Sequence, residues 1–143
     1  MPESIPRILE LEEHQSVLGA LLPFNFDHLP FAPRHSFFVH GVPAGEVRGR
    51  HAHKSCEQLL FCLSGSVLVL TNDGANQERF LLSRPTQGLL IPKMVWGEQK
   101  YLDGESSLLV FASEPYSSES YVEYFETFLE LKALLWEAGV GAD

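Results

Sequence analysis

The stretch Arg48-Gly49-Arg50-His51-Ala52-His53-Lys54 carries two of the six histidines and three of the ten basic side chains of the chain. Histidines two residues apart point to the same side only on a β-strand, because successive side chains alternate between its two faces. If this strand is one wall of a β-barrel, both imidazoles face the interior, and the neighbouring cations suit an anionic ligand. The stretch therefore predicts a ligand-binding strand of a barrel.

Short apolar runs follow one another along the middle of the chain, separated by Gly, Pro, Asn and Asp. They cover residues 37–39, 57–63, 67–70, 80–82, 88–92 and 108–111. A spacing of about ten residues between such runs is typical of an antiparallel sandwich or barrel. The end of the chain differs, since its apolar residues from Tyr121 to Leu135 follow a helical period. We predict one amphipathic helix over residues 120–137, docked on the β body.

The length of 143 residues suits a single domain, residues 1–143, in which residues 1–30 form a weakly patterned N-terminal arm. The net charge of −9 argues against nucleic acid as a partner, so an anionic ligand must meet a local basic patch. Cys56 and Cys62 are interpreted as buried thiols of a reducing compartment, because their spacing is not that of a CxxC pair. Neither a secretory signal nor an apolar run of about 18 residues is found, which predicts a cytoplasmic protein without membrane association.

The histidine stretch belongs to a longer pattern, which reads Gly45-x5-His51-x-His53-x3-Glu57-x7-Gly65. It resembles the first sequence motif of the cupins, and this resemblance implies an all-β fold, a cupin-type jelly-roll β-barrel with a C-terminal α-helix. In metal-binding cupins the two histidines and the glutamate are ligands, and a second motif supplies another histidine. The counterpart here, residues 88–97, has no histidine, so we expect no metal and no other cofactor. A metal-dependent cupin that uses His51, His53 and Glu57 stays open as an alternative.

A narrower resemblance is to the dTDP-4-keto-6-deoxyglucose 3,4-ketoisomerases, the WxcM-like sugar-nucleotide cupins. It is carried by Arg48-Gly49-x-His51-Ala52-His53-Lys54, Glu57-Gln58, Pro92-x3-Trp96-x-Glu98, Ala112-Ser113-x2-Tyr116 and Tyr121. The resemblance implies an isomerase that moves a carbonyl between carbons 4 and 3 of a dTDP-linked deoxyhexose. Small cupins of this family usually form dimers in which a strand crosses to the partner sheet. We therefore expect a homodimer, with residues 1–30 as the source of such a strand.

The chemistry of this isomerisation suits histidine, which titrates near neutrality, because a proton must leave the carbon beside a carbonyl and another must reach its neighbour. The family pattern makes His51 and His53 the acid/base pair, and the residues leave open which of them takes the carbon proton. Arg48 and Lys54 are candidates for binding the diphosphate, although Arg48 also suits a surface ion pair with a glutamate. Gln58 is a further candidate for substrate binding.

Several positions depart from the family pattern. Trp96 is a candidate for stacking on the base or sugar and equally suits a core, but it is followed by Gly97 where the family commonly has histidine. Phe37-Phe38 stand where the family has tyrosines, one of which contributes a phenol to the site. Either another histidine substitutes, or the substrate differs, or activity is reduced; the candidate histidines are His14, His35 and His40. A barrel that binds a nucleotide sugar without converting it is a further alternative.

Overall fold

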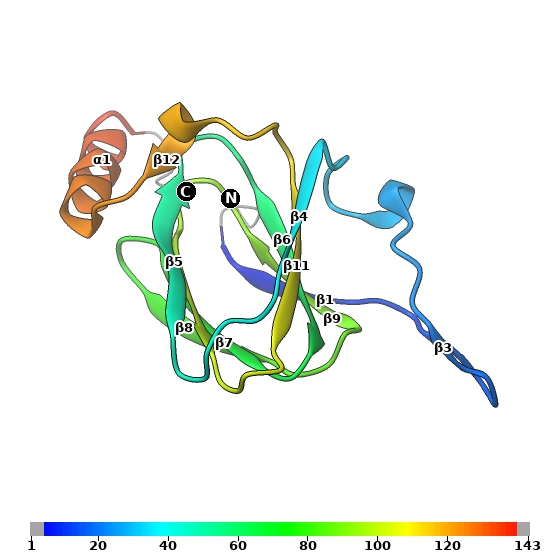
Figure 1. Ribbon diagram of the computed structural model, residues 1–143. Coiled ribbons are helices and arrows are strands. Elements are labelled where there is room, and N and C mark those ends of the chain that lie inside the picture. The colour runs from blue at the N-terminus through cyan, green and yellow to red at the C-terminus, as the bar shows by residue number, and fades with distance from the viewer. Residues whose placement is uncertain (1–4, 140–143) are drawn as a thin grey trace.

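The computed structural model describes residues 5–139, which form two facing antiparallel sheets, a separate hairpin and one helix (Figure 1). The strands are β1 (Arg7–Glu10), β2 (His14–Ser16), β3 (Gly19–Leu21), β4 (His35–Val39), β5 (Val47–His53), β6 (Gln58–Ser64), β7 (Val67–Asn72), β8 (Gln77–Leu82), β9 (Gln87–Ile91), β10 (Trp96–Tyr101), β11 (Ser107–Ala112) and β12 (Tyr121–Val122). The helices are η2 (Phe26–His28), η3 (Ser118–Ser120) and α1 (Phe125–Glu137). The predicted all-β class with a C-terminal helix is confirmed.

Each of the two facing sheets has five strands, in the orders β1-β9-β6-β11-β4 and β12-β5-β10-β7-β8. Side chains alternate between the two faces along each strand, so that one face of each sheet packs against the other sheet. The residues between them form the main core, and they include Leu60 and Cys62 of β6, Val67 and Val69 of β7, and Val110 of β11. Strands β4 and β5 belong to different sheets, and both contribute side chains to the space between them.

The outer faces of the two sheets are covered by different ends of the chain. On the first sheet, Phe61 and Phe111 pack against Phe24 of the N-terminal segment, whose ring lies 4.9 Å from that of Phe61. On the second sheet, Trp96 packs against Phe128 of α1. The N-terminal arm therefore covers the outer face of the first sheet, and the helix covers the outer face of the second.

Helix α1 begins at Phe125, five residues after the predicted start at 120. The intervening residues form η3 and the two-residue strand β12, in which Tyr121 lies opposite His53 and Val122 opposite Ala52. The free edge of β5 offers backbone hydrogen bonds to this segment, and that pairing outweighs the helical period of its side chains. The difference matters for the site, because it places Tyr121 beside the histidine pair.

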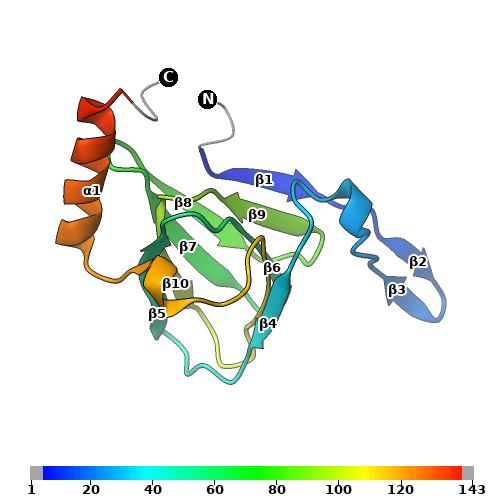
Figure 2. The same cartoon turned by 90° about the horizontal axis from the view of Figure 1, so that it is seen from above.

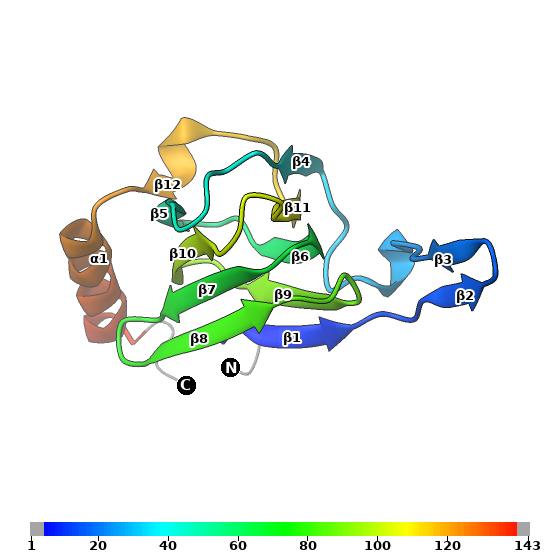
Figure 3. The same ribbon diagram turned by 60° about the horizontal axis from the view of Figure 1, so that its bottom comes forward.

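The hairpin of β2 and β3 projects away from the two sheets, on the side opposite α1 in all three views (Figure 1, Figure 2 and Figure 3). At its tip, Val17 and Leu18 are 101% and 95% exposed. Between residues 5 and 139, no helix combines the length and the apolar character that crossing a membrane would require.

Candidate active site

Strand β5 contains a β-bulge that decides which of its basic residues accompanies the histidines. Gly97 of β10 lies opposite His51, and the next residue, Glu98, lies opposite Gly49, so Arg50 is an extra residue in the ladder. Gly49 and Arg50 have φ angles of 89° and 58°, in the left-handed region. An extra residue reverses the alternation of side chains along the strand, and residues directly opposite each other share a face of the sheet.

As a result, Arg48 shares the inner face of β5 with His51. Arg48 lies opposite Gln99 and His51 lies opposite Gly97. Gln99 and Gly97 are two residues apart on β10, so they are on the same face of the sheet. Arg50 turns to the outer face instead, where its Nε lies 4.0 Å from Oε1 of Glu98. The electrostatics agree with this placement. Burial raises the pKa of Tyr101, on the inner face of β10, to about 12, and the charge of Arg48 acts in the opposite direction.

The two imidazoles of β5 lie side by side, as predicted. The ring centroids of His51 and His53 are 4.8 Å apart in an edge-to-face arrangement. The ring of Tyr121 packs against both, at 4.8 Å from His51 and 4.4 Å from His53. The backbone pairing of β12 with β5 thus gives the histidine pair an aromatic neighbour that limits its freedom to move.

The side chain of His53 is only 8% exposed. Within residues 5–139, neither its Nδ1 nor its Nε2 has a hydrogen-bond partner. A buried polar group without a partner costs about 1–3 kcal/mol, and such groups in folded proteins call for a specific explanation. A ligand that bonds to these nitrogens would provide one.

Both histidines are shifted towards the neutral form. Burial lowers the pKa of His53 to about 4, and the nearby charge of His51 adds to the effect. Burial also lowers the pKa of His51, while a hydrogen bond to the Gly49 backbone and the carboxylate of Glu123 act in the opposite direction. Near pH 7 the buried His53 is therefore a neutral imidazole, the form that accepts a proton.

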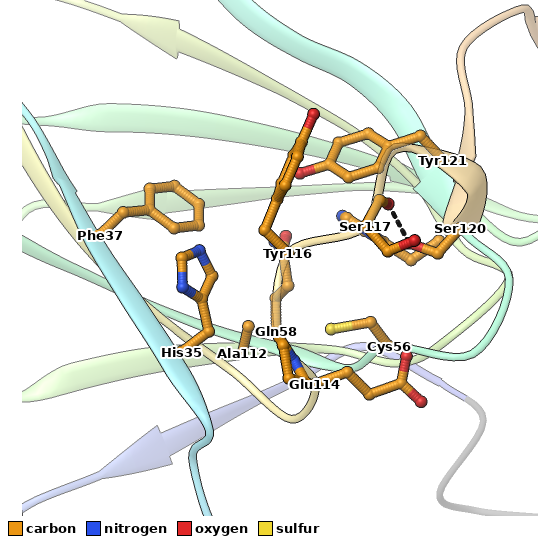
Figure 4. A pocket seen from close by; sticks show the side chains of 12 residues that line it. His35, Phe37, Cys56, Gln58, Ala112, Glu114, Tyr116, Ser117, Ser120 and Tyr121 are labelled. Carbon is orange, nitrogen blue, oxygen red and sulfur yellow. Dashed lines mark hydrogen bonds between the residues drawn. The ribbon is translucent and has the colours of Figure 1, made fainter.

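A pocket of about 240 Å³, which includes its open mouth, is lined by His53 of this pair but not by His51. Figure 4 shows the pocket from close by. It is lined by His35, Phe37, His53, Cys56, Gln58, Ala112, Glu114, Pro115, Tyr116, Ser117, Ser120 and Tyr121. Its floor is a row of three residues across the first sheet, because Ala112 of β11 lies opposite both His35 of β4 and Gln58 of β6. The small side chain of Ala112 leaves space between the two larger ones. Gln58, predicted as a substrate-binding residue, is 7% exposed and belongs to this row.

The two basic candidates are placed differently. Arg48 lies on the same face of β5 as the histidines, and within the described residues it forms no ion pair with Glu46 or Glu57. Lys54 has an exposed side chain, and its backbone N–H donates to the carbonyl of Ser120, 2.8 Å away at the pocket. Arg48 is thus on the inner face of β5 but is exposed like Lys54, and neither residue lines the pocket.

Trp96 lies away from the pocket, on the outer face of the second sheet. It immediately precedes Gly97, the residue opposite His51, so its side chain points to the other face. Its Nε1 donates to Oε2 of Glu98 at 3.0 Å, and its ring packs against Phe125 and Phe128 of α1 at 5.3 and 5.9 Å. Of the two roles considered for Trp96, the structure places it in the core beneath the helix.

The His51, His53 and Glu57 set is not gathered into a metal centre. Across residues 5–139, no three His, Cys, Asp or Glu side chains are grouped as a metal ion would need. Glu57 precedes Gln58, which lines the pocket, and its backbone is tied to Ser113, whose Oγ accepts the Glu57 N–H at 2.8 Å. The geometry therefore gives no support to a metal site made of these three residues.

Comparison with known proteins agrees with this picture. The family model described as "FdtA: WxcM-like, C-terminal" matches residues 5–133. The chain belongs to this WxcM-like family. A relative from Aneurinibacillus thermoaerophilus named TDP-4-oxo-6-deoxy-alpha-D-glucose-3,4-oxoisomerase is 32% identical over 101 residues, which cover 71% of this chain and 73% of the relative.

Two solved structures of WxcM-like relatives show how closely the fold is shared. A 3,4-ketoisomerase from Helicobacter canadensis has a TM-score of 0.85 and 31% identity, covering 90% of this chain and 97% of its own. QdtA, a sugar 3,4-ketoisomerase from Thermoanaerobacterium thermosaccharolyticum in complex with TDP, has a TM-score of 0.86 and 26% identity, covering 90% and 95%. The predicted cupin-type architecture is thereby confirmed.

In this WxcM-like chain, both departures noted in the sequence fall in or beside the site. Phe37 lines the pocket, so a phenyl ring lies there at one of the two positions where the family pattern has tyrosines. Gly97 lies opposite His51. Among the described residues, a Cβ built on Gly97 approaches only Cδ1 of Ile91 within 4 Å, at 3.5 Å, so an open space adjoins His51.

Sequence reasoning assigned no role to Cys56, Tyr116 and Tyr121, which line the pocket, and it named His35 only as one of three possible substitutes. Tyr116 and Tyr121 were part of the family pattern, and that signal alone could have marked them as site residues. Cys56 carries no comparable signal, and His35 reaches the pocket through the pairing of strands distant in sequence.

Proposed function

We propose that this protein is a 3,4-ketoisomerase that acts on a TDP-4-keto-6-deoxyhexose. The observation that carries the proposal is the imidazole of His53, which is buried beside His51 with both nitrogens unpaired within the described part of the chain. Membership of the WxcM-like family supports it, as do the names of the relatives, which are 3,4-ketoisomerases or oxoisomerases. The TDP bound to QdtA supports the nucleotide.

The reaction exchanges a carbonyl and a hydroxyl on neighbouring carbons without net gain or loss of electrons. A base removes the proton from carbon 3, the oxygen on carbon 4 gains a proton, and an enediol forms. The hydroxyl on carbon 3 then loses its proton while carbon 4 receives one, which gives the 3-keto sugar. His51 and His53 act as the acid/base pair. Burial keeps His53 in the neutral, proton-accepting form near neutral pH, although its lowered pKa makes it a weaker base than a free histidine.

The remaining candidates bind the nucleotide sugar. Arg48 is on the same face of β5 as the histidines and offers a forked contact to the diphosphate. Lys54, at the edge of the pocket, adds a second positive charge. Gln58, on the pocket floor, donates to or accepts from a sugar hydroxyl.

The test is to incubate the purified protein with TDP-4-keto-6-deoxyglucose in deuterated water and to follow the ring protons by NMR. A new 3-keto isomer with deuterium at carbon 4, together with exchange at carbon 3 of the remaining 4-keto substrate, is the expected result, and a His53→Gln variant should give neither. Binding of the nucleotide sugar with no exchange would select the alternative of a non-catalytic binding barrel. The presence of Phe37 in the pocket and of Gly97 opposite His51 is the observation that favours this alternative.

The working form of the enzyme is a homodimer in which the projecting hairpin contacts the second subunit. Val17 and Leu18 at the hairpin tip are fully exposed, and Leu21 at its base is 61% exposed. Apolar side chains gathered on a projecting segment suit burial against a partner. A Val17→Asp/Leu18→Asp variant should lower the mass measured by light scattering to that of a monomer, and an unchanged dimer would contradict this arrangement. A cytoplasmic location, and the lack of nucleic-acid or membrane partners, stay predictions.

A further inference from the structure

The pocket has two walls, and His53 of the histidine pair lies in one of them. The other is formed by β4, where His35 and Phe37 point into the same pocket as His53 (Figure 4). We infer that His35 is a third catalytic group, which transfers protons at the two oxygens of the reacting sugar. This inference rests on the proposed ketoisomerase function, and it concerns one of the three histidines considered as substitutes for the missing tyrosine and histidine of the family pattern.

The position of His35 follows from the pairing of strands. It is the first residue of β4, and its backbone lies opposite Ala112 of β11, which in turn lies opposite Gln58 of β6. His35 and Gln58 are therefore two strands apart on one face, about 9–10 Å between backbones, with only the methyl group of Ala112 between them. That interval is wide enough for a hydroxyl-bearing edge of a sugar.

The two walls belong to different sheets. Strand β4 is the edge of the first sheet and β5 lies in the second, so His35 and His53 reach one pocket from two directions. A hexose bound between the sheets meets the β5 histidines on one side and His35 on another. Proton transfer at a carbon and at the oxygens of the same sugar requires groups that approach from different directions, and this arrangement provides them.

His14 and His40, the two other histidines considered as substitutes, lie elsewhere. His14 is on the projecting hairpin and is exposed. His40 follows the end of β4, is exposed, and stacks on Phe38 with ring centroids 5.4 Å apart. Neither lines the pocket.

The pocket contains other polar side chains, but their contacts limit what they can do. Tyr121 packs on both β5 imidazoles, and Tyr116, at the mouth, is 67% exposed. Oε1 of Glu114 accepts a hydrogen bond from Oγ of Ser55 at 2.8 Å, and the thiol of Cys56 donates to the carbonyl of Glu57 at 3.3 Å. His35 contacts Phe37, with ring centroids 5.7 Å apart, and its imidazole carries both a donor and an acceptor.

The proton balance assigns His35 a complete cycle. When the β5 pair removes the proton from carbon 3, His35 gives a proton to the oxygen on carbon 4. When the β5 pair then gives a proton to carbon 4, His35 takes the proton from the oxygen on carbon 3, and both groups return to their starting forms. Electrons stay within the sugar, so no oxidant or reductant is needed.

The experiment compares His35→Gln with His40→Gln, a matched substitution just past the same strand and outside the pocket. Loss of a proton-transfer group should lower kcat by about 10²–10⁴-fold in His35→Gln, with TDP affinity unchanged, while His40→Gln keeps the wild-type kcat. Imidazole added to a His35→Ala variant should restore part of the lost turnover, because the pocket is open to solvent. A His35→Val/Phe37→Tyr variant places a phenol on the same face of β4. Its kcat should be higher than that of His35→Val alone.

The outcomes separate this inference from the proposed function. If the wild type converts the keto sugar and His35→Gln turns over at the rate of the His40→Gln control, His35 has no catalytic role. The same conclusion follows if His35→Gln loses turnover but neither added imidazole nor the Phe37→Tyr substitution restores any of it, since a structural role alone explains such a loss. A wild type that binds TDP but converts no 4-keto sugar removes the proposed function and this inference together.

Discussion

Replacing His53 with leucine is expected to make the protein more stable and at the same time inactive. The reason is that the imidazole is 8% exposed and its two nitrogens lack hydrogen-bond partners within residues 5–139. Removing a buried, unpaired polar group and filling the space with an apolar side chain should recover about 1–3 kcal/mol of unfolding free energy at pH 7. A gain of stability on loss of a functional residue is the trade-off expected of an active site.

The difference in unfolding free energy between the wild type and His53→Leu should grow as the pH falls. Folding lowers the pKa of His53 from 6.5 to about 4, so between these values the unfolded chain binds a proton that the folded chain does not. The wild type therefore loses stability from about pH 6.5 downwards, and the loss is complete below about pH 4. At 1.36 kcal/mol per pKa unit the full loss is about 3 kcal/mol, of which about 2 kcal/mol falls between pH 7 and pH 5.

Urea unfolding at pH 7 and pH 5, followed by tryptophan fluorescence, measures both effects. A His53→Gln variant is the control, since its side chain is polar but cannot titrate. Its unfolding free energy should depend on pH as weakly as that of His53→Leu. At pH 7 it should gain less unfolding free energy than His53→Leu does. The reasoning is refuted if the wild type and His53→Leu lose the same unfolding free energy between the two pH values. Parallel losses would mean that His53 is not held as a buried, neutral imidazole.

Three further substitutions test the geometry of β5 and β10. Arg48→Gln should weaken TDP binding by about 10–100-fold, as expected for loss of a charge-assisted hydrogen bond, and calorimetric titration measures it; unchanged affinity would place the diphosphate elsewhere. Gly49→Ala should lower the unfolding free energy by about 1–2 kcal/mol, because the φ of Gly49 is +89° and an added Cβ would lie 3.2 Å from Nε2 of Gln99. Gly97→His should change the unfolding free energy by less than about 1 kcal/mol, because within the described chain its Cβ approaches only Cδ1 of Ile91, at 3.5 Å. A large loss in urea unfolding would show that the space opposite His51 is closed.

Local patterns predicted much of the fold. The alternation of side chains along a strand correctly placed His51 and His53 on one face, and the recurring apolar runs correctly indicated an antiparallel sandwich or barrel. The helical period also identified α1, although it could not locate its start. Residues from Tyr121 satisfy that period, but their backbone pairs with β5 instead, and a side-chain period contains no information about the free edge of a distant strand.

The position of the basic residues shows where alternation fails. A regular strand would place Arg48 and Arg50 together on the face opposite His51. The bulge at Gly49 and Arg50 separates them, so that Arg48 joins the histidines and Arg50 pairs with Glu98. One extra residue moves all following side chains of the strand to the opposite face of the sheet. Its presence is visible only in the register of β5 with β10.

Trp96 and His35 show the same dependence on register. For Trp96, packing and stacking were equally open until its neighbour Gly97 was found opposite His51, which turns the indole towards α1. His35 enters the pocket because β4 pairs with β11 at Ala112 and β11 pairs with β6 at Gln58.

The sequence by itself determined the chemistry available to this protein: two imidazoles on one strand face, cations beside them, and an all-β framework with a helix at its end. Those features depend on contacts between near neighbours along the chain, so residue type and spacing are enough to specify them. Only the tertiary structure decided which groups meet. Strand register and a single bulge select Arg48 over Arg50, bring His35 to the pocket of His53, and bury Trp96 beneath α1.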